Sequence, residues 1–168
     1  MASNKRIGTV TRGTTNPNRL RRVDRYIASL PILKLGRPVV VDLGYGASPI
    51  TAIELQDRLS KVNHSVQVVG IEIEKDRVAR GKEVERPGLS FMLGGFETPL
   101  PEGFENADVI RAFNVLSQYD ESDVPAAWKL MTSRLSKHGV LVEGTCDEIG
   151  RLSTWITLTV EGPKLFSI

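Results

Sequence analysis

The sequence predicts an α/β protein with a mostly parallel sheet, helices on both faces and an antiparallel hairpin at the C-terminal end. Two patterns lead to this prediction. Apolar runs without alternation, typical of strands buried on both faces, recur between helix-like stretches. The last part of the chain instead alternates polar and apolar residues on either side of Glu161-Gly162-Pro163, which is typical of a hairpin.

Helices in the first half are indicated by apolar residues at helical spacing and by residues that start or end helices. Leu20, Val23 and Ile27 share one face of the first helix, which Pro31 ends, and Asp76 opens the third. The strands are β-branched and apolar. The expected elements are a loop over residues 1–18, helices over 18–30, 48–60 and 76–87, and strands over 39–43, 66–73 and 89–93.

The second half continues the alternation and then changes character. A fourth strand is expected over 108–113 and a fifth over 139–143. Between them, Trp128, Met131 and Leu135 indicate the inner face of a helix over residues 120–136. The expected hairpin strands are 155–160 and 164–168.

Length and charge indicate one domain preceded by a basic arm. A chain of 168 residues is long enough for one sizeable core. We expect a basic, partly disordered arm over residues 1–18 and a single domain over 19–168. Residues 1–25 carry a net charge of +6, whereas the whole chain carries +2. The arm is either a solvated leader or a segment that contacts the phosphates of RNA or another anion.

Several classes of protein are not indicated. No apolar run approaches the roughly 18 residues of a membrane span, and no signal peptide is evident. We therefore expect a cytoplasmic protein that does not bind a membrane. Cys146 is the single cysteine and there are two histidines, so neither an internal disulfide nor a metal site is expected.

The stretch Val-Val-Val-Asp-Leu-Gly-Tyr-Gly, which ends at Gly46, marks a candidate cofactor site. In an open α/β sheet, ligands bind beyond the carboxyl ends of the strands, and Gly44 and Gly46 allow a tight turn and close approach of a ligand. A dinucleotide site would have a third glycine where Pro49 stands, and Asp42 would repel its pyrophosphate. The acid instead favours a cofactor with a cationic end, such as S-adenosylmethionine.

Three segments resemble motifs of the class I S-adenosylmethionine-dependent methyltransferases, which have a Rossmann-like fold. Asp42-Leu43-Gly44-Tyr45-Gly46 is similar to their glycine-rich first motif, and Gly70-Ile71-Glu72 to the second, whose acid binds the ribose hydroxyls. The stretch from Ala107 to Asn114 resembles the fourth motif. The resemblance covers roughly residues 36–146.

The resemblance implies a set of site residues. Asn114 is the candidate catalytic residue, facing the methyl group or the target nucleophile, and Phe96 would contact the adenine. Asp147 and Glu148, after the fifth strand, are candidate substrate residues. The implied cofactor-binding residues are Asp42, Gly44, Tyr45, Gly46, Glu72, Gly95, Phe96 and Asn114.

The sequence departs from the family pattern in two places. Gly95 or Phe96 stands where the family often has an acid near the adenine amino group. Residues 146–153 are short for the helix that the family has after its fifth strand. Either the fold is shortened, or the chain is part of a longer protein.

The expected function is methyl transfer from S-adenosylmethionine to a small molecule or RNA. Two alternatives remain: an inactive or incomplete cofactor-binding module, and an RNA-binding protein that uses the arm. We expect the arm to be dispensable for cofactor binding, because it contains no strand-end loop. The strand-like C-terminal segment would leave one sheet edge exposed, which predicts a homodimer.

Overall fold

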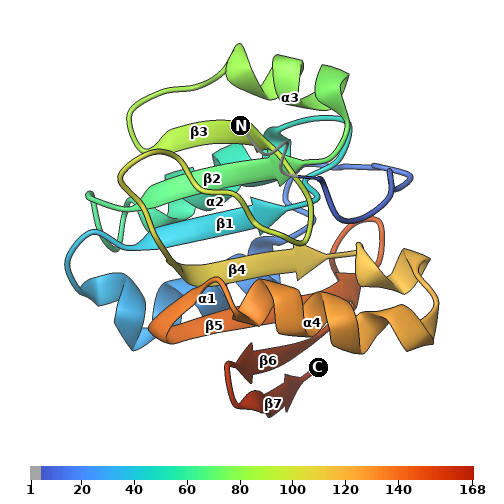
Figure 1. The fold of residues 1–168 in the computed structure, drawn as a ribbon. Coiled ribbons are helices and arrows are strands. Elements are labelled where there is room, and N and C mark those ends of the chain that lie inside the picture. Colours follow the sequence, from blue (N-terminus) through green and yellow to red (C-terminus); the bar gives the residue numbers. More distant parts are fainter. Residues whose placement is uncertain (1–4) are drawn as a thin grey trace.

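The computed structural model describes residues 5–168 and contains one seven-stranded sheet with the order β3-β2-β1-β4-β5-β6-β7 (Figure 1). The first five strands are parallel, and the last two are antiparallel. The predicted fold class is therefore confirmed. The strands are β1 (Val39–Leu43), β2 (Gln67–Glu72), β3 (Leu89–Leu93), β4 (Ala107–Phe113), β5 (Leu135–Cys146), β6 (Ser153–Thr159) and β7 (Gly162–Ser167).

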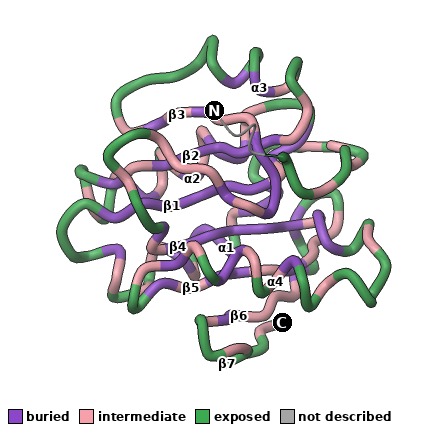
Figure 2. Tube along the Cα trace, in the orientation of Figure 1, coloured by how far each residue is buried: buried purple, intermediate pink, exposed green. Residues whose placement is uncertain are grey.

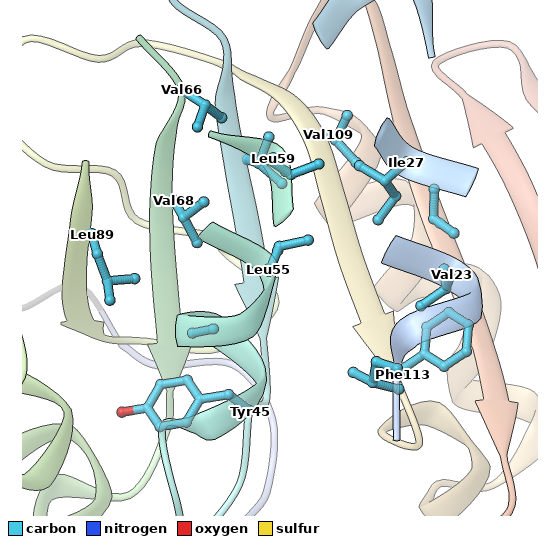
Figure 3. Packing of buried hydrophobic residues seen from close by; sticks show 14 of the residues in the cluster. Val23, Ile27, Tyr45, Leu55, Leu59, Val66, Val68, Leu89, Val109 and Phe113 are labelled. Atoms are coloured by element: carbon cyan, nitrogen blue, oxygen red, sulfur yellow. The ribbon is translucent and has the colours of Figure 1, made fainter. Parts of the chain in front are cut away.

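Helices cover both faces of the sheet and divide the core in two. The helices are α1 (Arg21–Ser29), α2 (Ile50–Leu59), α3 (Lys75–Lys82) and α4 (Val124–Thr132). One core lies under α1 and α2 and includes Ile27, Leu55 and Val68 (Figure 3). The other lies under α4 and includes Met131 and Leu141. Buried positions follow the central strands, whereas β7 is mostly exposed (Figure 2).

Helix α4 is shorter than the sequence suggests, and β5 is longer. The helix ends at Thr132, and Leu135 begins β5 instead of extending the helix. Leu135 pairs with Ala107, and the neighbouring Ser136 donates its hydroxyl to Asp108. Leu135 is buried, as it would be on the inner face of a helix or in a strand of the sheet. Its helical spacing from Trp128 and Met131 therefore did not distinguish the two elements.

The antiparallel part of the sheet follows β5 directly. Residues 147–152 form a turn without a helix, and β6 then pairs back on β5. Strand β7 forms an edge on which Leu165 and Phe166 are exposed. A homodimer through this edge stays a prediction. In residues 5–168 no helix has both the length and the apolar character needed to cross a membrane.

Candidate functional site

The glycine-rich loop after β1 lies at the carboxyl end of the sheet, as predicted. The amide of Gly44 donates to the carbonyl of Ile71 at the end of β2, 2.8 Å away. Gly44 has a φ of 73°, and a Cβ on it would lie 2.5 Å from Cγ2 of Val115. Both the conformation and the contact require glycine here.

Asp42 is neutralised inside the protein. Its carboxylate lies 2.8 Å from Nη2 of Arg111 and accepts a hydrogen bond from the hydroxyl of Thr51, also at 2.8 Å. Asp42 is 2% exposed and Arg111 is fully buried. The argument that a free Asp42 charge selects a cationic cofactor is therefore wrong, because a buried charge already pairs with it.

Arg111 belongs to a larger buried ion network that the sequence analysis missed. It also pairs with Asp24 of α1, which in turn pairs with Arg58 of α2. Burial alone lowers the pKa of Arg111, but Asp42 and Asp24 raise it by more, so the guanidinium stays charged. An arginine within an otherwise apolar strand is the signal that a buried acid must face it.

Glu72 ends β2 next to the glycine-rich loop, as the resemblance implies. Its Oε2 accepts the amide of Gly46 at 3.0 Å, and its Oε1 accepts the amide of Ile73 at 2.9 Å. Arg77 of α3 lies 3.4 Å from Oε2. The carboxylate is buried and tied to the loop; its Oε2 already has two donors, and its Oε1 still has capacity for a further one.

Tyr45 is in the loop, but its side chain points into the core. Its ring packs edge-on against Phe91, with centroids 5.2 Å apart, and Figure 3 shows it among the apolar side chains of the core. Its hydroxyl donates to the carbonyl of Arg77. The side chain of Tyr45 thus points away from the strand ends. Its predicted role in cofactor binding is therefore limited to its backbone.

Gly95 and Phe96 follow β3, as expected, but the Phe96 ring is buried. It packs against Tyr119 with centroids 5.2 Å apart. The amide of Phe96 donates to the carbonyl of Ile7, 2.8 Å away. The ring therefore has no open face in this arrangement on which adenine could stack.

Asn114 ends β4 in a left-handed conformation, with a φ of 57°. Its Oδ1 accepts the amide of Cys146 at 2.9 Å, and its Nδ2 lies 3.3 Å from the sulfur of Cys146. These contacts fix the side chain between the ends of β4 and β5. Asn114 also lines a cavity together with Asp42 and Gly46.

The two candidate substrate acids have different surroundings. Asp147 accepts the amides of Arg151 and Leu152 with its Oδ1, which stabilises the turn before β6. That oxygen has a structural role, and the substrate role of Asp147 stays a prediction. Glu148 is exposed, and only its carbonyl is engaged, by the Asn16 side chain at 3.0 Å.

The N-terminal segment crosses the strand ends, and we call residues 6–15 the strap. In Figure 1 the blue start of the chain lies beside the arrowheads of β1 and β2. The carbonyl of Gly13 accepts the amide of Ala47, and the amide of Arg12 donates to Gln118. The arm thus contains no strand-end loop but contacts two of them, and its dispensability for cofactor binding stays a prediction. The first four residues of the predicted arm lie outside the described residues.

Little space remains between the strap and the motif residues Gly44, Glu72 and Asn114. Two cavities of about 40 and 20 Å³ are lined by both strap residues and motif residues. The larger contains Gly44 and Asn114, and the smaller contains Glu72 and Phe96. Within residues 5–168, no cluster of histidine, cysteine or acidic side chains is arranged to hold a metal ion.

Comparison with solved structures identifies the fold. A magnesium protoporphyrin IX methyltransferase from Synechocystis with bound S-adenosylhomocysteine is 16% identical and has a TM-score of 0.58; the match covers 76% of this chain and 54% of that one. Human N-acetylserotonin methyltransferase in complex with S-adenosylmethionine is 19% identical and has a TM-score of 0.55, with 79% and 37% covered. This is the class I methyltransferase fold.

The methyltransferase fold also occurs in a Haloferax volcanii methyltransferase bound to the Trm112 methyltransferase activator. That protein is 16% identical, with a TM-score of 0.55, and the match covers 76% of this chain and 52% of that one. This chain spans about half, or less, of the length of these neighbours. No family model matches the sequence, and no curated protein matches it either.

Proposed function

We propose that the protein binds S-adenosylmethionine at the carboxyl ends of β1, β2 and β4 and transfers its methyl group to an acceptor. The observation that carries the proposal is the bond from the amide of Gly46 to the carboxylate of Glu72, 3.0 Å long. It joins the glycine-rich loop to the acid of the neighbouring strand. The solved neighbours with bound S-adenosylmethionine or S-adenosylhomocysteine support the choice of cofactor.

The residues at the strand ends fit this cofactor. A buried carboxylate that accepts two backbone amides is fixed in position. Its Oε1 can accept one ribose hydroxyl, and its Oε2 can accept the second when that hydroxyl replaces Arg77. Gly44 and Gly46 allow the backbone to approach a nucleoside closely. Asp42 acts indirectly, because its pairing with Arg111 ties β1 to β4 beneath the loop.

The main task of the protein in this reaction is alignment. The bound cofactor would supply a methyl group on a sulfonium centre, which is already activated for displacement. Asn114, held by Cys146, is the polar side chain at the end of β4 that we assign to positioning the acceptor. Holding the reactants in line and excluding water provides most of the rate enhancement in such a step.

The acceptor is a small molecule or RNA. Lys5, Arg6 and Arg12 are exposed and are suited to phosphate contacts, whereas Arg19 is buried and donates to the carbonyls of Thr14 and Asp147. The basic charge near the chain start is thus partly structural. Contacts of the exposed cations with RNA would weaken steeply as the salt concentration rises.

A second candidate is a cofactor-binding module that is inactive by itself. Two observations favour it. The match covers only about half of the length of the solved neighbours, and the cavities at the strand ends are small. Production of S-adenosylhomocysteine from S-adenosylmethionine in the presence of RNA or of small-molecule extracts separates the two candidates.

Titration calorimetry of Glu72→Gln tests the cofactor site. Because a hydrogen bond to a charged group contributes about 1.5–3 kcal/mol, the variant should bind S-adenosylhomocysteine more weakly by that amount. Glu83→Gln, which changes an exposed acid at the end of α3, is the matched control and should bind like the unmodified protein. Unchanged affinity in a folded Glu72→Gln variant, or binding of NAD in preference to S-adenosylhomocysteine, would overturn the assignment.

A further inference from the structure

The strap makes backbone hydrogen bonds with two strand-end loops, one of which carries Gly44 and Gly46 of the proposed cofactor site. The carbonyl of Gly13 accepts the amide of Ala47 at 3.0 Å, and the carbonyl of Ile7 accepts the amide of Phe96 at 2.8 Å. Ala47 belongs to the glycine-rich loop after β1, and Phe96 to the loop after β3. The strap therefore occupies one backbone amide in each of two strand-end loops.

Glycines in both loops fit the strap closely. A Cβ on Gly46 would lie 2.9 Å from the carbonyl oxygen of Gly13, and a Cβ on Gly95 would lie 2.1 Å from that of Ile7. The strap itself has glycines where its backbone takes φ values of 133° and 72°, at Gly8 and Gly13. Side chains at any of these positions would prevent the contact or strain it, so the sequence accommodates a docked strap.

Arg77 connects the strap to the acid proposed to bind the ribose. Its Nη2 donates to the carbonyl of Thr11 at 2.9 Å, and its Nη1 lies 3.4 Å from Glu72. A ribose that forms hydrogen bonds with both oxygens of Glu72 displaces this guanidinium from Oε2. Occupation of the site and docking of the strap are thereby linked.

The space left between the strap and Glu72 is too small for a nucleoside. Ligand sites have volumes of roughly 300–1,000 Å³, whereas the two cavities that reach Glu72 or Asn114 hold about 40 and 20 Å³. A larger hollow of about 440 Å³ lies between the strap and Ala47, but neither Glu72 nor Asn114 lines it. We propose that the strap is an intramolecular plug of the cofactor cleft, and that docking of the strap and binding of S-adenosylmethionine exclude each other. This inference rests on the proposed function and adds a means of regulating it.

The way the strap is anchored suits a plug that can leave. Ile7 is 45% exposed and Val10 is 57% exposed, so the strap buries little apolar surface. Its backbone also donates to the side chains of Glu97, Tyr119 and Gln118, and these hydrogen bonds are exposed. Segments with few buried apolar contacts and exposed hydrogen bonds open at a lower free-energy cost than the core. The apparent affinity for the cofactor is reduced by the fraction of molecules in which the strap is open, and loosening the strap increases that fraction.

The double substitution Gly8→Val/Gly13→Val in the full chain loosens the strap without changing a strand-end loop. Val is strained at both backbone conformations. Gly36→Val/Gly103→Val is the matched control, because both positions have positive φ and a Cβ there would meet no atom within 4 Å. Two readouts are used: the affinity for S-adenosylhomocysteine by calorimetry, and hydrogen exchange of the strap amides by mass spectrometry.

We expect the strap variant to bind S-adenosylhomocysteine at least tenfold more tightly than the control variant and the unmodified protein. In the unmodified protein, saturating S-adenosylhomocysteine should speed exchange of the strap amides. Equal or weaker binding by the strap variant, or slower strap exchange with ligand, would contradict the plug while leaving the cofactor site intact. Binding to none of the three proteins would instead contradict the proposed function and, with it, this inference.

Discussion

The guanidinium of Arg111 and the carboxylate of Asp42 form an ion pair at 2.8 Å in which neither side chain is more than 3% exposed. The pair joins neighbouring strands β4 and β1 directly below the glycine-rich loop. The carboxylate of Asp42 thus joins β1 to β4 and is not available to bind a ligand. The same guanidinium also binds Asp24, which Arg58 binds as well, so two arginines balance the two buried acids.

Replacement of Arg111 by methionine should destabilise the fold strongly. Removing one partner of a buried ion pair leaves an unpaired buried charge and costs about 3–5 kcal/mol. Urea denaturation measures the loss. Lys164→Met, which breaks the exposed pair with Glu161, is the control and should cost no more than about 1 kcal/mol. A loss below about 1 kcal/mol for Arg111→Met would show that the buried network does not support the fold.

Glu143 of β5 should make stability depend on pH. Burial raises its pKa above the ordinary value of 4.5, and Trp128 partly opposes the rise. The folded state therefore favours the protonated form, and its stability falls as the pH rises from 4.5 through the folded pKa. Glutamine does not ionise, so the stability of Glu143→Gln should not fall in this way. The variant should be more stable than the unmodified protein at pH 8, and the difference in stability should shrink towards pH 4.

Urea midpoints at pH 4, 6 and 8 test this expectation. Glu102→Gln, on the exposed surface, controls for the loss of one negative charge. A Glu143→Gln variant that is less stable than the unmodified protein at pH 8 would mean that the carboxylate has a stabilising partner in the folded state.

The stabilities of variants at Asn114 should depend on how well each residue adopts the left-handed backbone conformation of this position. Alanine removes both contacts with Cys146 and tolerates a φ of 57° less well than asparagine does, at a cost of about 1–3 kcal/mol. Glycine loses the same contacts but adopts this φ freely, so Asn114→Gly should be more stable than Asn114→Ala. Thermal denaturation measures the order. The reverse order, which is usual in regular structure, would contradict the left-handed conformation.

The sheet was predictable from sequence because its strands are continuous apolar runs. Strand β3 matches the prediction at both ends, and β1 does as well. The boundary between α4 and β5 was not predictable, since Leu135 satisfies the spacing of a helix while pairing in a strand. An apolar residue next to a helix end carries no information on which element will bury it.

The candidate site was predictable in position but not in its contacts. Glu72 and Gly46 were expected together from their places after adjacent strands, and the structure joins them by a hydrogen bond. The strap was missed because it binds through backbone carbonyls, such as that of Gly13, which leave no apolar pattern in the sequence. The partner of Asp42 was missed because Arg111 lies 69 positions along the chain.

A crystal structure of the full chain with S-adenosylhomocysteine tests the central claim most directly. The account predicts the ribose hydroxyls within hydrogen-bonding distance of Glu72, and the bond between Gly13 and Ala47 broken by displacement of the strap. A structure in which that bond remains and the ligand binds elsewhere, or does not bind at saturating concentration, would contradict the account.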